Sequence, residues 1–111
     1  MNEEQKIIQK YFLPIADNPE SLQLLNDAAF INIKKKMVIS SDMMIENVHF
    51  DKLDDPFYLA QKLLRVNLSD IAAMGAKPFG YVLNLSIPKL NHKSWLEKFC
   101  RGLANDTEKF N

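Results

Sequence analysis

The sequence predicts an α+β domain with the element order helix, strand, strand, helix, strand, helix. Apolar residues recur at helical spacing between Ala60 and Ile71. Caps and chain breakers separate that stretch from segments rich in aromatic and β-branched residues, which favour strands. The expected strands are 28–33, 37–41 and 79–87. A sandwich of this order usually returns to its sheet once more, so we expect a single domain, 1–111, that lacks its final strand.

The first helix is predicted from its cap. Asn2 and Gln5 have the spacing of a capping box. Four apolar residues then share one face of the helix: Ile7, Ile8, Tyr11 and Phe12. Pro14 ends this helix, and the polar stretch 17–23 is expected to be a surface loop.

The other two helices also have recognisable ends. Asp55 followed by Pro56 is a typical helix start, and Gly75 supplies the stop of that helix. Asn91 is the expected cap of the last helix. Four residues should form the buried face of the last helix: Leu96, Phe99, Cys100 and Leu103.

The composition excludes several classes of protein. The 111 residues carry 14 basic and 14 acidic side chains, and this zero net charge argues against binding to nucleic acid or to a membrane surface. No apolar run approaches the length of a membrane-spanning helix, and the first ten residues lack the apolar core of a signal peptide. The single cysteine, Cys100, is expected to be a buried packing residue in a cytoplasmic protein.

The stretch from Val66 to Pro78 contains two polar residues that a helix built only for packing would not need. Asn67 falls on the apolar side of the predicted helix, and Asp70 falls at its edge. Desolvating such groups without partners costs a few kcal/mol or more. A partner for Asp70 is therefore expected.

Three aspartates lie at the ends of predicted elements, where a scaffold presents functional groups: Asp27, Asp42 and Asp70. Together with the hydroxyls of Ser40 and Ser41 they form an oxygen-only ligand set, which suits a hard ion such as Mg²⁺. Taken singly, each aspartate is more typical of a cap, a turn residue or a surface residue than of a metal ligand. The three glycines form no phosphate-binding loop, so a nucleotide site would have to hold phosphate through metal ions.

Residues 40–50 are SSDMMIENVHF, and residues 66–78 are VNLSDIAAMGAKP. These two long motifs resemble the patterns S-T-D-x-x-V-x-x-x-H-F and V-N-L-S-D-x-A-A-M-G-A-x-P of thiamine-monophosphate kinases. Residues 7–12 resemble the first helix of that family, and Trp95-Leu96-Glu97 a later helix start. The resemblance runs in register from about residue 3 to the end of the chain.

The resemblance implies a fold, a reaction and a set of ligands. The fold would be the ATP-binding N-terminal domain of the superfamily that includes aminoimidazole ribonucleotide synthetase and selenophosphate synthetase, and the domain would pair in a homodimer. The reaction would transfer the terminal phosphoryl group of ATP to thiamine monophosphate. Carried over by motif, several Mg²⁺ ions would be held by Asp27, Ser40, Ser41, Asp42 and Asp70. His49 would contact the thiamine phosphate, and Asn67 would orient ligands or simply pack at the helix interface.

No catalytic base is expected, because the acceptor phosphate is already ionised at neutral pH. Two departures from the family pattern stand out: Leu25 and Asn26 replace the glycine and the first acid of G-D-D. The family also continues with a G-G-D strand and a second domain, so we expect this chain alone to be inactive or nearly so. The alternatives are a non-catalytic truncated remnant or dimerisation module and, less well supported by the H-F pair, another kinase or synthetase of the superfamily.

Overall fold

The computed structural model describes residues 2–25, 28–87 and 92–110. Contacts divide the chain into two compact units, 1–36 and 37–111, which are treated separately below. The prediction of a single domain, 1–111, is not tested by this division and stays a prediction. Within the described ranges, no helix has both the length and the apolar character that crossing a membrane requires.

The first unit is built from short helical turns. Helix α1 (Glu3–Ile7) begins at the predicted capping box, where Asn2 accepts from the Gln5 N–H and the Gln5 side chain accepts from the Asn2 N–H. The chain continues as a π-helical segment, η1 (Ile8–Phe12). A 3₁₀ segment, η2 (Pro19–Leu24), follows where a loop was expected, because Asn18 caps it and Pro19 opens it.

The second unit is organised around α2 (Pro56–Ala73). Its start is as predicted: the Asp55 side chain accepts from the Phe57 N–H, and proline occupies the first helical position. Its end is also as predicted, because Gly75 has a φ of +71°. The Gly75 and Ala76 N–H groups donate to the carbonyls of Ala72 and Ile71, which is the Schellman arrangement that satisfies a helix end.

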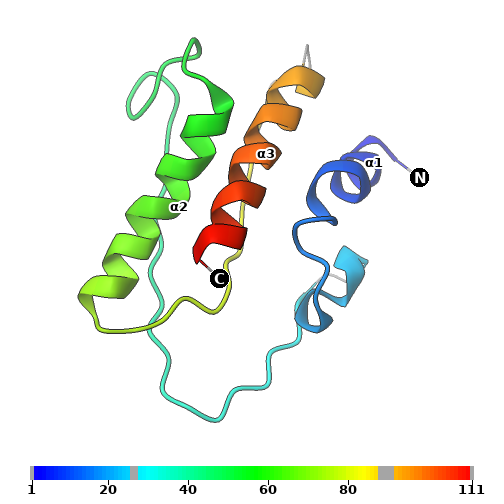
Figure 1. Cartoon of the computed structure of the whole chain (residues 1–111). Helices are drawn as coiled ribbons and strands as arrows, with labels where there is room; N and C mark the ends of the chain where they lie inside the picture. Colours follow the sequence, from blue (N-terminus) through cyan, green and yellow to red (C-terminus); the bar gives the residue numbers. More distant parts are fainter. Residues whose placement is uncertain (1, 26–27, 88–91, 111) are drawn as a thin grey trace. The chain divides into compact units, whose positions relative to one another are not determined.

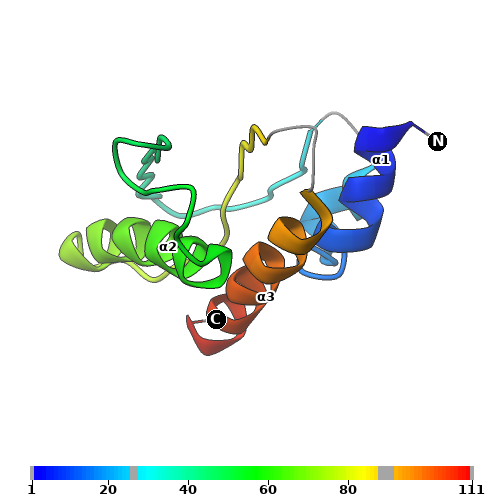
Figure 2. The ribbon, with the colours of Figure 1, turned by 90° about the horizontal axis from the view of Figure 1, so that it is seen from above.

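Helix α3 (His92–Phe110) packs against α2, and the two helices run in the same direction (Figures 1 and 2). The predicted inner face of α3 is confirmed, because Leu96, Phe99, Cys100 and Leu103 are all buried. They pack with Leu59 and Ala60 from α2 to form the core of this unit. The predicted cap, Asn91, lies outside the described residues.

The predicted α-β-β-α-β-α order is wrong. In the part of the chain that the structure describes there is no strand, and the segments 28–33, 37–41 and 79–87 are extended but irregular. The only ladder-type pairing described there is an isolated bridge between Glu46 and Phe50. Strand propensity measures how well a residue fits a paired, half-buried surface, and these segments lack both pairing and burial. The described fold is therefore helical.

Candidate functional site

Ser40 and Asp70, two predicted ligands thirty residues apart in sequence, lie together. Asp70 is in the last turn of α2, and Ser40 is in the extended segment that passes this helix end. The Ser40 hydroxyl donates to Oδ2 of Asp70 at 3.3 Å. Ser40 is therefore the partner that was expected for Asp70, although Asp70 is exposed rather than desolvated.

The position of Asp70 in α2 is electrostatically unfavourable. The carboxyl end of a helix carries partial negative charge, so an acid in the last turn is disfavoured there and a cation beside it is favoured. The last turn of α2 contains no basic residue. A hard cation beside Asp70 would offset this repulsion, and the Ser40 hydroxyl is a chemically suitable additional ligand.

The other predicted metal ligands do not join this pair in the described structure. Asp42 is exposed, and its Oδ1 accepts from the N–H of the next residue, Met43, at 2.9 Å. Ser41 is exposed, and Asp27 lies outside the described residues. Among residues 2–25, 28–87 and 92–110, no three histidine, cysteine or acidic side chains gather in a way that could hold an ion. The oxygen donors suit Mg²⁺, but the described residues do not form a complete site for it.

Asn67 is half-buried and bonds within its own helix. Its Nδ2 donates to the Leu63 carbonyl at 2.9 Å, one turn earlier. This bond satisfies the amide donor that the sequence placed on the apolar side of α2. The suggested role in orienting ligands stays a prediction.

His49 lies in a tight turn just before α2. The Ile45 N–H donates to its Nδ1 at 3.0 Å, and the His49 N–H donates back to the Ile45 carbonyl at 2.9 Å. The turn is closed further by Asn47, whose φ is +68° and whose N–H donates to the Phe50 carbonyl. Asparagine is one of the few residues that tolerate such a left-handed conformation.

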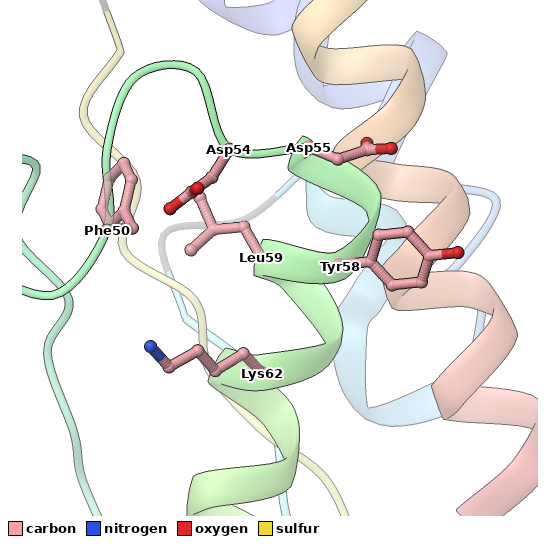
Figure 3. A pocket seen from close by; sticks show the side chains of 6 residues that line it. All are labelled: Phe50, Asp54, Asp55, Tyr58, Leu59 and Lys62. Atoms are coloured by element: carbon pink, nitrogen blue, oxygen red, sulfur yellow. The ribbon is translucent and has the colours of Figure 1, made fainter.

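A shallow pocket of about 300 Å³ lies beside this turn (Figure 3). It is lined by Phe50, Asp54, Asp55, Tyr58, Leu59 and Lys62. In the close-up, Phe50, Asp54 and Lys62 face one side of α2, whereas the Tyr58 ring points away from them. Lys62 also donates to the His49 carbonyl at 3.1 Å. Nothing in the sequence pattern singled out Lys62, which is one of several exposed lysines.

A half-buried ion pair joins α2 to α3, and sequence analysis also missed it. Nε and one terminal nitrogen of Arg65 donate to the two carboxylate oxygens of Asp106 at 2.8 and 2.9 Å. The Asp106 side chain is fully buried, whereas Arg65 remains about half exposed. These hydrogen bonds raise the pKa of the Arg65 guanidinium above its usual value. Asp106 follows Leu103 on the buried face of α3, and this helical spacing was the signal that could have revealed it.

Burial also determines the protonation of the Cys100 thiol. Desolvation raises the pKa of its thiol to about 12. A thiol that stays protonated at neutral pH is not an effective nucleophile. Its predicted burial is confirmed.

The comparison with protein families gives the class of this chain. Residues 25–111 match the family described as AIR synthase related protein, N-terminal domain. The match covers well over half of the sequence, and the chain belongs to this family. No solved structure matches it significantly.

Curated proteins similar to this chain include thiamine-monophosphate kinases, which confirms the resemblance seen in the motifs. The chain is 42% identical to the Caulobacter vibrioides enzyme over 80% of its length, and 38% identical to the Escherichia coli K12 enzyme over 90%. It is 32% identical to the Haemophilus influenzae enzyme over 97%. These alignments cover only 26%, 32% and 34% of the respective relatives, so the chain spans about a quarter to a third of their length.

Proposed function

We propose that this chain is the ATP- and magnesium-binding part of an enzyme that phosphorylates thiamine monophosphate to thiamine diphosphate. The names of its relatives support a kinase of thiamine monophosphate. The observation that carries the proposal within this chain is the contact between Ser40 and Asp70, because two residues of separate motifs meet at one helix end.

The proposed metal ligands differ from the residue that is proposed to contact the acceptor phosphate. Ser40, Ser41, Asp42, Asp70 and Asp27 are the proposed Mg²⁺ ligands, and a bound ion would neutralise phosphate charge. His49 is the proposed contact to the phosphate of thiamine monophosphate. Since that phosphate is already an anion, this chain needs to bind and orient it rather than remove a proton from it.

Magnesium-dependent binding of ATP to the 111-residue chain tests this proposal without requiring turnover. We expect Asp70→Asn and Asp42→Asn each to weaken binding about tenfold or more in titration calorimetry, since each removes a charged ligand. Asn26→Ala should have a smaller effect than Asp42→Asn. Glu97→Gln, which neutralises an exposed acid on α3, is the matched control and should bind as the parent does.

Two results would contradict the ligand assignment. One is equal affinity of Asp70→Asn and the parent chain, and the other is equal loss in Asp42→Asn and Asn26→Ala. A coupled assay for ADP formation with thiamine monophosphate and Mg²⁺ then measures activity directly. We expect low turnover from this chain by itself, and turnover comparable to that of a full-length relative would refute this expectation.

A further inference from the structure

The turn that carries His49 fixes the position of one ring nitrogen. Nδ1 accepts a hydrogen bond from the Ile45 N–H, so this nitrogen carries no proton. A neutral imidazole then carries its proton on Nε2, the ring nitrogen that does not accept from the Ile45 N–H. The turn therefore presents His49 as a hydrogen-bond donor through Nε2.

Lys62 connects this turn to α2. Its ammonium group donates to the carbonyl of His49 itself, at 3.1 Å, and its side chain lies on the side of α2 where Phe50 is found (Figure 3). Asp70 lies eight residues further along α2, which is about 12 Å along the helix axis. Lys62 thus links the His49 turn to α2, the helix that also carries Asp70.

We propose that Lys62 is a positioning residue, which holds the His49 turn so that the Nε2–H is offered to a phosphate monoester. This inference rests on the proposed function for its ligand, but the geometry of the turn does not depend on it. Without the Lys62 bond, the residues from Ile45 to Phe50 keep only bonds within the turn. Loss of this anchor on α2 would loosen the turn and weaken the bond from the Ile45 N–H to Nδ1, so that the other tautomer becomes accessible.

Nuclear magnetic resonance of isotope-labelled histidine tests the proposal in the full 111-residue chain. The sequence contains only two histidines, so His92→Gln assigns the His49 signals. We expect the Nε2–H tautomer in the parent chain, a mixture of tautomers in Lys62→Met, and recovery of the Nε2–H tautomer in Lys62→Arg. Lys98→Met removes an exposed lysine from α3 and should leave the His49 signals unchanged.

Titration with thiamine monophosphate, and with thiamine as the control without phosphate, separates the two proposals. We expect thiamine monophosphate to shift the Nε2 signal, and Lys62→Met to weaken this binding roughly three- to tenfold. An unchanged tautomer in Lys62→Met would overturn the positioning role even if thiamine monophosphate binds. Conversely, a tautomer that depends on Lys62 with no response to thiamine monophosphate would support the positioning role and count against the proposed function.

Discussion

Gly102 lies where α3 is in close contact with α2, and replacing it with alanine tests the packing of the two helices. A Cβ at this position would lie 3.0 Å from the Phe57 carbonyl carbon and 3.1 Å from the Ala60 Cβ, and closer still to the Phe57 carbonyl oxygen. The lower edge of ordinary contact is 3.4 Å. Because two of these three atoms belong to the backbone of α2, a rotamer change cannot relieve the overlap, and the helices must separate.

The expected size of the effect follows from two opposing contributions. Overpacking a well-packed core costs about 3 kcal/mol when backbone has to move. Alanine is favoured over glycine in a helix by about 1 kcal/mol. We therefore expect Gly102→Ala to lower the free energy of unfolding by about 2 kcal/mol, which corresponds to a fall in Tm of roughly 10 °C.

Fluorescence of the single tryptophan provides the assay. Trp95 stacks on the buried ring of Phe99 at a centroid distance of 4.7 Å, so its emission reports the packing of α3 during urea unfolding. Ala104→Gly, at an exposed position of the same helix, measures the propensity difference alone and should cost about 1 kcal/mol. If Gly102→Ala were more stable than the parent by that amount, the proposed close approach of α2 and α3 would be refuted.

Three further predictions concern the ion pair, the thiol and the extended segments. Asp106→Asn should lower Tm on the order of 10 °C in a thermal melt, because the amide cannot accept both N–H groups of Arg65; an unchanged Tm would show that the pair does not stabilise the helix contact. The Cys100 thiol has a raised pKa in the folded chain, so its contribution to stability is fully present below about pH 9 and is lost as the pH rises toward 12. The urea midpoint should therefore fall less steeply with alkaline pH in Cys100→Ala than in the parent, and parallel profiles would contradict the burial argument. Ile39 and Val82 are 85% and 86% exposed in unpaired extended segments, so we expect the chain to self-associate. The double variant Ile39→Lys, Val82→Lys should scatter less light than the parent chain. A monodisperse monomer of the parent chain would contradict this expectation.

The helices were predictable because their signals are local. The capping box at Asn2 and Gln5, the Asp55 cap and the Gly75 stop each depend on residues within one turn, and each is present in the structure. The periodic apolar face of α3 was sufficient to identify its buried hydrophobic residues, although not the buried Asp106. Such patterns need no knowledge of distant parts of the chain.

The candidate site was predictable only in part, because some of its contacts join parts of the chain that are distant in sequence. Motif positions led to Ser40 and Asp70, and the structure places them in contact. The link from Lys62 to the His49 carbonyl has no sequence signal, because a flexible side chain meets a backbone group that every residue possesses. The partner of Asp106 was equally hidden, since only the packing of α2 on α3 brings Arg65 to it.

The strand predictions were wrong because a strand requires pairing with a second segment, whereas composition describes one segment by itself. Residues 37–41 and 79–87 have the composition of strands, and their backbone is extended, but the structure gives them no ladder partner among the described residues. Backbone N–H and C=O groups that no ladder satisfies must be satisfied by water, which is possible only while the segment stays exposed. The exposure of Ile39 and Val82 is therefore the consequence of the missing pairing. Ser40 lies inside one of these unpaired segments, and its hydroxyl still donates to Asp70. The position of Ser40 therefore depends on its contact with the end of α2 rather than on pairing within a sheet.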